Sequence, residues 1–160
     1  MSDERNDLAT LGDLVKPGEV VMLATVGDGG RLEARPMSLE DLDAEGRLWF
    51  FTEFDAPKHA QLDADRRVLV TLSGKDYVSI QGTGVVIRDP HRQRELWNSP
   101  AEAWLQCEPT DPKVGLLVVQ PTGAQYWQTP GLLSAALGVA VAAVKGERPD
   151  LGANETLELS

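Results

Sequence analysis

Short hydrophobic segments separated by turn-forming residues run through most of the chain, and this pattern predicts an antiparallel sheet. Aromatic and β-branched residues bounded by Gly, Pro or Asp are typical of strands. The segments that fit lie at residues 20–26, 32–38, 48–52, 67–72 and 77–87. Residues 114–120 and 124–128 predict a final hairpin around Pro121-Thr122-Gly123.

Three of these segments carry signals that restrict their place in the sheet. Gly27-Asp28-Gly29-Gly30 predicts a tight turn between the first two strands. Pro36 has no amide proton for a ladder, so the second strand is expected at a sheet edge or at a bulge. Gly82 and Gly84 inside the long segment predict a bulge or a sharp bend.

Helical periodicity is confined to short connecting segments. Leucines at helical spacing predict a helix over residues 7–15, Asp89-Pro90 opens another, and Ser99-Pro100-Ala101-Glu102 predicts a capped third one. Residues 132–145 are expected to form a helix with an apolar face. We expect one domain over residues 1–145 and an acidic flexible tail over 146–160.

The segment Leu48-Trp49-Phe50-Phe51-Thr52 predicts the central strand, and it leads directly into a helix start. Asp55 is the expected cap, Pro57 the expected first turn, and residues 58–64 the helix. A strand that ends at a helix N-terminus brings free amide groups and the positive end of a dipole to one place. With Lys58 in the first turn, this predicts an anion site, and phosphate is the usual anion.

The order of these elements predicts the fold class. Six or seven strands in hairpin order, with helices only as connections, favour a mainly β protein, an antiparallel β-barrel with peripheral helices. A chain of 160 residues with 42% hydrophobic residues is long enough to bury a core of this kind.

The charge of the chain narrows the classes of partner. The formal net charge of −10 argues against nonspecific binding of nucleic acid or of anionic membranes, which both need basic surfaces. The first fifteen residues lack the apolar core of a secretory signal, and the longest apolar run, 132–144, is shorter than the roughly 20 residues that span a bilayer. A cytoplasmic protein is expected.

Few residues are available for direct catalysis. The two histidines, His59 and His91, stand beside no evident nucleophile and are expected on exposed helix surfaces, and with a single cysteine they predict no zinc site and no disulfide. No glycine-rich phosphate loop is present. The remaining candidates are two cations, two hydroxyls, an amide and tryptophans: Arg35, Lys58, Thr52, Ser79, Gln81, Trp49, Trp97, Trp104 and Trp127. From the residues alone, a barrel that binds a phosphorylated aromatic ligand is the furthest conclusion.

Several motifs, taken in order, carry a resemblance to a known family. They are Met22-Leu23-Ala24-Thr25-Val26, Ala34-Arg35-Pro36-Met37, residues 48–52 with Lys58, Tyr77-Val78-Ser79-Ile80-Gln81-Gly82, Leu96-Trp97, Asp111-Pro112 and Tyr126-Trp127. This series, over residues 8–128, resembles the pyridoxamine 5′-phosphate oxidase-like FMN-binding split barrels, and more narrowly their general stress protein branch.

The resemblance implies a homodimer with FMN in two grooves at the subunit interface. Arg35 and Lys58 would hold the phosphate, and Pro36, Met37 and the segment Trp49, Phe50, Phe51 and Thr52 would flank the isoalloxazine ring. Ser79 and Gln81 would approach a flavin, often the partner's, and Trp127 would close the site. The implied function is that of a flavin-binding, stress-related protein, with NAD(P)H-dependent oxidoreductase activity as one form of it.

Two alternatives to turnover with FMN stay open. One is a protein that sequesters or senses flavin, and the other is an oxidoreductase that uses a deazaflavin. Pyridoxamine phosphate oxidation itself is not expected, because the C-terminal part offers only Lys145 and Arg148 for a second phosphate. Relatives carry serine, and the oxidases then arginine, where this chain has Ala56 and Pro57, so a hydroxyl and a cation are missing beside Lys58.

Overall fold

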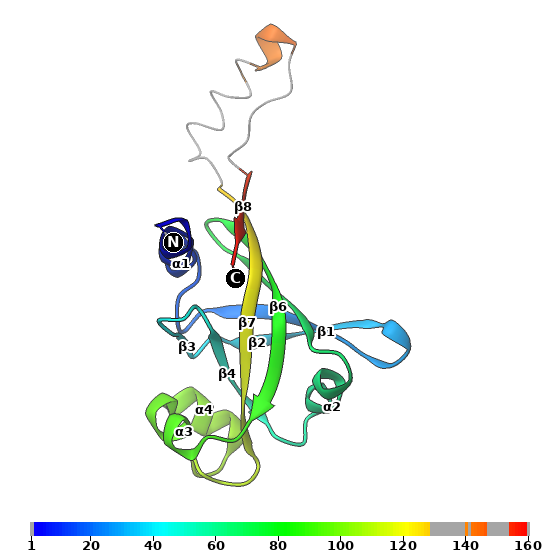
Figure 1. The fold of residues 1–160 in the computed structure, drawn as a ribbon, viewed down its shortest axis with the longest axis vertical. Helices are drawn as coiled ribbons and strands as arrows, with labels where there is room; N and C mark the ends of the chain where they lie inside the picture. The colour runs from blue at the N-terminus through cyan, green and yellow to red at the C-terminus, as the bar shows by residue number, and fades with distance from the viewer. Residues whose placement is uncertain (1, 129–139, 141, 147–153, 160) are drawn as a thin grey trace.

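The structure is a computed structural model that describes residues 2–128, 140, 142–146 and 154–159. Eight strands and four α-helices are defined there (Figure 1). In chain order they are α1 (Ser2–Leu14), β1 (Val20–Val26), the 3-10 turn η1 (Asp28–Gly30), β2 (Leu32–Ser38), β3 (Asp41–Leu42), β4 (Leu48–Glu53), α2 (Pro57–Ala64), β5 (Arg67–Ser73), β6 (Tyr77–Ile87), α3 (Pro90–Leu96), α4 (Ser99–Leu105), β7 (Val114–Trp127) and β8 (Asn154–Glu158).

All strand pairs are antiparallel, and the strands form one sheet in the order β2-β1-β5-β6-β7-β4-β3, with β8 on β7. β2 lies at one end of this order, which confirms the edge position predicted from Pro36. The register between β6 and β7 shifts between Gln81 and Gly82, which confirms the predicted bulge. The two expectations drawn from Pro36 and Gly82 therefore hold in the folded chain.

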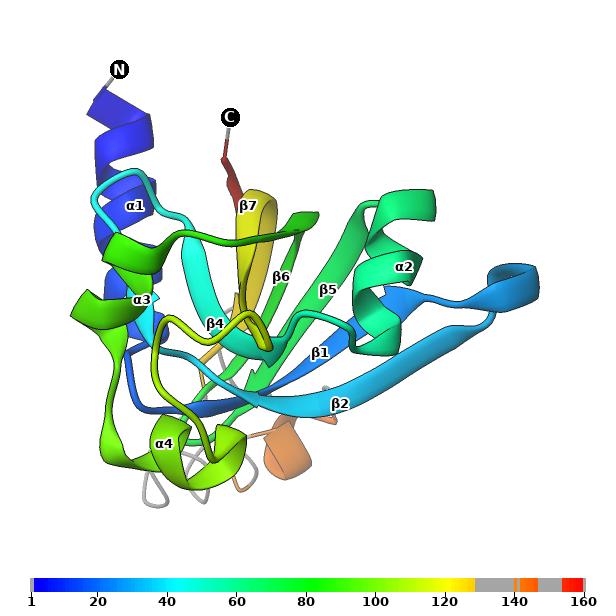
Figure 2. The same ribbon diagram turned by 90° about the horizontal axis from the view of Figure 1, so that it is seen from below.

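The sheet curls until its two ends meet. β2 contacts β4, although no ladder joins these two strands among the described residues, and Leu39 and Glu40 link β2 directly to β3 (Figure 2). The result is an antiparallel barrel that is split between β2 and β4, with the helices at its periphery, which confirms the predicted fold class.

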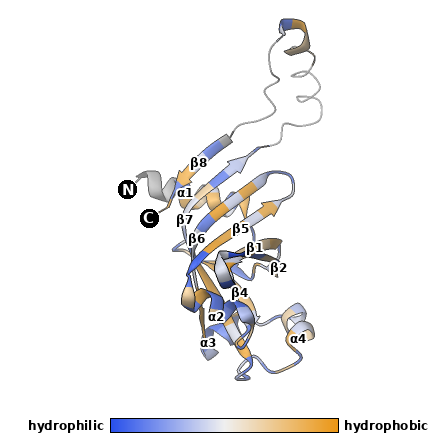
Figure 3. Cartoon of the chain, turned by 90° about the vertical axis from the view of Figure 1, so that its right-hand side faces the viewer, coloured by the Kyte–Doolittle hydropathy of each residue, from blue (hydrophilic) through white to orange (hydrophobic). Residues whose placement is uncertain are grey.

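The interior of the barrel is built by the two-residue period of the strands. Along β6, buried side chains alternate with more exposed ones, and the first four residues of β5 alternate in the same way. Hydrophobic residues occur along both strands (Figure 3). Leu11 of α1, Phe50 of β4 and Leu117 of β7 are fully buried in the resulting core. At roughly 1.5–3 kcal/mol for each large apolar side chain, this burial supplies the main driving force for folding.

The predicted hairpin over residues 114–128 is wrong, because this segment is one continuous strand. On one side β7 pairs with β6 throughout; on the other it pairs with β4 up to Val119 and with β8 from Gly123 onward. Pro121 lies where one partner has ended and the next has not begun. A residue without an amide proton is tolerated there, so the Pro-Thr-Gly sequence marks a change of partner rather than a turn.

The predicted flexible tail is also wrong for its last part. Residues 154–158 form β8, and Leu157 and Leu159 are buried against the barrel. Leu157 and Leu159 stand on either side of Glu158, so both leucines fall on one face of the strand, which the acidic composition of the segment had hidden. The predicted helix over 132–145 falls mainly outside the described residues; within it, residue 140 and residues 142–145 are helical.

Two helix caps differ from the predicted ones. α2 begins after Ala56 rather than Asp55, and no side chain caps it. α4 is capped by Asn98 rather than Ser99, with Asn98 Oδ1 accepting from the Ala101 amide at 2.8 Å. Pro57 is therefore the first residue of α2, one position earlier than a cap at Asp55 would place it, whereas Pro100 is the second residue of α4, one position later than a cap at Ser99 would place it.

Gly82 marks the tightest backbone approach in the bulge and generates the first prediction. A Cβ atom added there would collide with the backbone carbonyl of Gln120 on β7. We expect Gly82→Ala to lower the free energy of unfolding by about 1–3 kcal/mol, since β6 and β7 must separate to admit the methyl group. Urea unfolding followed by tryptophan fluorescence measures this.

Gly74 supplies the matched control, because a Cβ atom there has no neighbour within 4 Å. Gly74→Ala should leave stability unchanged or raise it slightly by restricting the unfolded chain. Equal stability of the two variants would mean that the bulge relaxes without cost.

Candidate functional site

A cavity of about 620 Å³ occupies the split between β2 and β4, with α2 at one end and α4 at the other (Figures 1 and 2). Its lining contains six of the residues that the sequence predicts as cofactor ligands: Arg35, Pro36, Met37, Phe51, Thr52 and Lys58. The other residues that line it are Val20, Ser38, Glu40, Glu53, Ala56, Pro100, Ala101, Trp104 and Leu105.

Lys58 is half-buried in the first turn of α2 and reaches back to the end of β4. Its Nζ donates a hydrogen bond to Thr52 Oγ1 at 2.8 Å, and the Thr52 side chain is itself buried. Burial lowers the pKa of Lys58, and the nearby charge of Arg35 lowers it further, while Glu53 opposes both effects. The structure therefore holds two cations close together at a partly desolvated place, where an anion would stabilise both.

Arg35 is held by a chain of hydrogen bonds that the sequence did not predict. Its Nη1 donates to Thr25 Oγ1 at 2.7 Å, Thr25 donates to Gln61 Oε1 at 2.7 Å, and Gln61 Nε2 donates to Glu33 at 2.8 Å. Because each group in this series of hydrogen bonds donates to the next, the series fixes the orientation of the Arg35 guanidinium. Burial lowers the pKa of Arg35, and Glu33 opposes this effect.

The two cations differ in how far their charge is neutralised. Arg35 Nη2 lies 3.8 Å from a carboxylate oxygen of Glu33. Among the described residues, Lys58 has no carboxylate within ion-pair distance, and Glu53, which attracts it from further away, is itself paired with Lys113 at 3.6 Å. Lys58 therefore attracts an anion in this cavity more strongly than Arg35 does.

The start of α2 adds to this positive end of the cavity. Ala56 lines the cavity and precedes the helix, and no side chain accepts a hydrogen bond from the first amides of α2. Helix N-termini attract anions through these amides and through the helix dipole. The anion site predicted from the strand-to-helix junction thus has its cation, its hydroxyl and its helix end in one place.

Apolar side chains line the rest of the cavity. Phe51 and Met37 contribute from β4 and β2, and Pro100, Trp104 and Leu105 contribute from α4. Ser38, Glu40 and Glu53 are polar residues in the same lining. Burial raises the pKa of Glu40, while hydrogen bonds from Asn98 and Ser38 act in the opposite direction. One charged end and one largely apolar wall suit a planar ligand that carries an anionic group.

Ser79 and Trp127 lie outside this cavity. They line a second cavity of about 310 Å³ on β1, β5, β6 and β7. Val20 lines both cavities, so the two are neighbours on the surface of the barrel. Several partly exposed apolar side chains surround this second cavity: Val20, Met22, Tyr77 and Trp127.

The remaining predicted ligands, Trp49, Phe50 and Gln81, line neither cavity. Phe50 is fully buried in the core. The guanidinium carbons of Arg47 and Arg92 lie 5.5 and 4.8 Å from the centroid of the Trp49 ring, and Trp49 Nε1 donates to Asp43 at 2.9 Å. Gln81 is exposed on β6 beside Gly123.

Sequence reasoning named Trp104 only as one of four candidate tryptophans, and it missed Thr25, Gln61, Glu40 and the other α4 residues of the site. Gln61 follows Lys58 by three positions, so it lies on the same side of α2, and this helical spacing was an available signal. The contribution of α4 had no local signal, because it depends on where the segment between β6 and β7 folds back.

The two histidines take structural places outside the cavity. His59 is half-buried rather than exposed, since its ring packs edge-on against Phe54 and bonds the Phe54 carbonyl oxygen at 2.8 Å. His91 is exposed, as predicted. Across the described ranges, no three His, Cys, Asp or Glu side chains gather closely enough to hold a metal ion, and no helix is long and apolar enough to cross a membrane.

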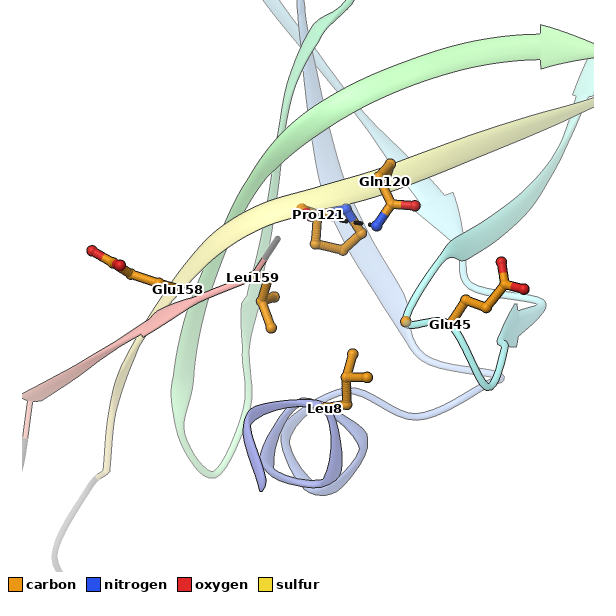
Figure 4. Close-up of a pocket in the computed structure, with 7 residues that line it drawn as sticks. Leu8, Glu45, Gln120, Pro121, Glu158 and Leu159 are labelled. Atoms are coloured by element: carbon orange, nitrogen blue, oxygen red, sulfur yellow. Dashed lines mark hydrogen bonds between the residues drawn. The ribbon is translucent and has the colours of Figure 1, made fainter. Parts of the chain in front are cut away.

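A further pocket of about 60 Å³ lies between α1, the loop before β4, the middle of β7 and the C-terminal end of β8. Figure 4 shows Leu8, Glu45, Gln120, Pro121, Glu158 and Leu159 around it. It lies beside the part of β7 where the ladder with β4 has ended and the ladder with β8 has not begun. Its small volume and its two carboxylates make it unsuitable for an anionic cofactor.

The family model described as "Pyridoxamine 5′-phosphate oxidase like" matches residues 6–150 of the chain. No curated protein matches it. Among solved structures, a protein described as general stress protein 26 from Jannaschia sp. CCS1 is 27% identical, with a TM-score of 0.72, over 97% of this chain and 99% of that one.

Two more structures bear on the cofactor. The general stress FMN/FAD binding protein from Xanthomonas citri is 30% identical, with a TM-score of 0.65, over 82% of this chain and 92% of that one. A structure named F420 reductase is 20% identical, with a TM-score of 0.55, over 71% of this chain and 94% of that one, which shows a shared fold.

Proposed function

We propose that this chain, which belongs to the pyridoxamine 5′-phosphate oxidase-like family, binds FMN in the cavity between β2 and β4. The observation that carries the proposal is the convergence of Lys58, Arg35 and Thr52 with the uncapped start of α2 at one end of a largely apolar cavity. Likeness to the general stress FMN/FAD binding protein of Xanthomonas citri supports the flavin as ligand.

In this proposal Lys58 and Arg35 hold the phosphate, and Thr52 fixes the Lys58 ammonium. Pro36, Met37 and Phe51 contact the ring system along β2 and β4. The bound flavin supplies the redox chemistry, and the protein supplies position, a partly dry cavity and a positive field. No side chain of the cavity is assigned as a catalytic acid or base.

We propose further that the protein is an oxidoreductase that takes electrons from NAD(P)H. The open length of the cavity beyond its cationic end favours turnover over pure storage, since a second substrate needs access to the ring. A flavin-sequestering or sensing protein is the competing function. The likeness to the F420 reductase favours a deazaflavin as the competing cofactor.

The protein is also proposed to act as a homodimer. The partly exposed apolar side chains around the second cavity, among them Met22, Tyr77 and Trp127, form a surface that a second copy would cover. This surface adjoins the FMN cavity at Val20, which supports the proposal that Ser79 and Trp127 contact a flavin held by the partner. Gln81 would extend the same strand surface.

Lys58 provides the first test of FMN binding. A charge-assisted hydrogen bond to phosphate contributes roughly 1.5–3 kcal/mol, which is about tenfold to a hundredfold in affinity. Lys58→Ala should weaken FMN by that factor and leave riboflavin, which lacks the phosphate, nearly unaffected. Fluorescence titration of both flavins on the stripped protein measures both constants, and exposed Lys75→Ala is the matched control.

The same titration has a pH dependence with a defined sign. The pKa of Lys58 is lowered in the free protein, and a bound phosphate would raise it, so FMN affinity should fall as pH rises through the free-protein value. The fall should begin at a lower pH than for an ordinary lysine and should disappear in Lys58→Ala. If Lys58→Ala lost affinity for FMN and for riboflavin by the same factor, Lys58 would not contact the phosphate.

Turnover is tested by the visible spectrum. The FMN-loaded protein should lose its yellow absorption when NAD(P)H is added without oxygen, and an added electron acceptor should restore it. A flavin that stays oxidised under these conditions would favour sequestration, whereas a protein that binds a deazaflavin in preference to FMN would identify the competing cofactor.

Association is tested by light scattering. At micromolar concentration the protein should elute as a dimer of the 17.4 kDa chain. Replacing Met22 with glutamate puts a charge on the proposed contact surface and should shift the population toward monomer, because a buried unpaired charge is strongly unfavourable. A monodisperse monomer for the unmodified chain would contradict the proposal.

A further inference from the structure

Trp104 is the most exposed aromatic side chain named among the large exposed hydrophobics, at 82% of its possible surface. The rest of α4 buries its apolar residues normally, since Ala101 and Leu105 are 5% and 0% exposed. An exposed indole forgoes the burial energy that a residue of this size can gain, about 1.5–3 kcal/mol for large apolar side chains. Its position therefore calls for a functional explanation.

The indole borders the cavity at the end away from the cations. Trp104 lines it together with Pro100, Ala101 and Leu105, whereas Lys58 and Ala56 line it from α2 (Figures 1 and 2). A ligand with its phosphate at the start of α2 would extend its other end toward α4. This places the largest apolar side chain of the cavity opposite the anion site.

Contacts at both ends of α4 hold the helix that carries the indole. At the N-terminal end, Asn98 caps the helix and donates from Nδ2 to Glu40 Oε2 at 2.5 Å. At the C-terminal end, Lys113 Nζ donates to the Leu105 carbonyl at 3.0 Å. Because these contacts and its buried side hold the helix, α4 keeps its position even though the Trp104 indole itself is not packed.

We infer that Trp104 is the ring-recognition residue of this site and stacks on the isoalloxazine ring of the flavin. The inference rests on the proposed binding of FMN and adds the residue that selects for a planar aromatic ring. An indole face contacts any flat π-system with little cost in side-chain entropy, and stacking of bases on aromatic side chains is worth about fivefold to a hundredfold in affinity.

The test separates ring recognition from phosphate recognition. Trp104→Ala should weaken FMN and riboflavin by the same factor, about tenfold, because both carry the ring. Lys58→Ala should weaken FMN alone. Trp104→Phe, which keeps an aromatic face, should recover most of the lost affinity for both flavins. Titrations use the full chain stripped of bound flavin, with urea unfolding to establish that each variant is folded.

Glu102→Ala is the matched control, because Glu102 is exposed on α4 and does not line the cavity. It should leave both affinities unchanged. The double variant Lys58→Ala, Trp104→Ala should lose FMN affinity by the product of the two single factors, since the two residues contact opposite ends of the ligand.

Three results would overturn the inference. Unchanged affinity of Trp104→Ala for both flavins would remove the indole from the site while leaving FMN binding intact. A change in oligomeric state at unchanged flavin affinity would assign Trp104 to a contact between copies. Failure of the unmodified protein to bind either flavin would contradict the proposed function itself, and the role of Trp104 with it.

Discussion

The split between β2 and β4 is the constraint on which the site depends. Leu39 and Glu40 join the two edges of the strand order at one point, yet no ladder closes the barrel there in the described part of the chain. A closed barrel would have filled this space with paired backbone and packed side chains. Since it stays open, Arg35 from β2 and Thr52 from β4 face one cavity instead of a core.

Local patterns predicted most of the fold because they have local causes. Strands β1 and β6 follow from their β-branched residues and bounding turns, the edge position of β2 follows from the amide proton that Pro36 lacks, and the bulge follows from the Cβ atom that Gly82 lacks. β7 was misread because its Pro121-Thr122-Gly123 sequence has the composition of a turn. Its true role depends on β8, a strand more than thirty residues further along the chain, and no local pattern reports such a pairing.

The residues of the candidate site also divide into those that lie close together in the sequence and those that only the complete fold brings together. Lys58 and Thr52 lie six residues apart across one strand-to-helix junction, so the sequence could bring them together. The support for Arg35 comes from Thr25 and Gln61, on two other elements, and the apolar wall comes from α4. These contributions arise from the way the barrel curls, which is a property of the whole sheet and not of any one segment.

The cations of the site give it a local positive charge, which is opposite in sign to the net charge of the whole chain. A formal charge of −10 repels a dianion at long range, but salt screens that repulsion beyond about 8–10 Å. Within the cavity, Arg35 gives up part of its field to Glu33, whereas Lys58 is balanced only by a hydroxyl and a distant carboxylate. Ala56 and Pro57 supply neither a hydroxyl nor a cation beside Lys58, so the proposed attraction for phosphate rests on Lys58 and Arg35. In the proposed complex, the partly desolvated Lys58 ammonium at the start of α2 and the apolar wall on α4 would together orient an anionic planar ligand along the split.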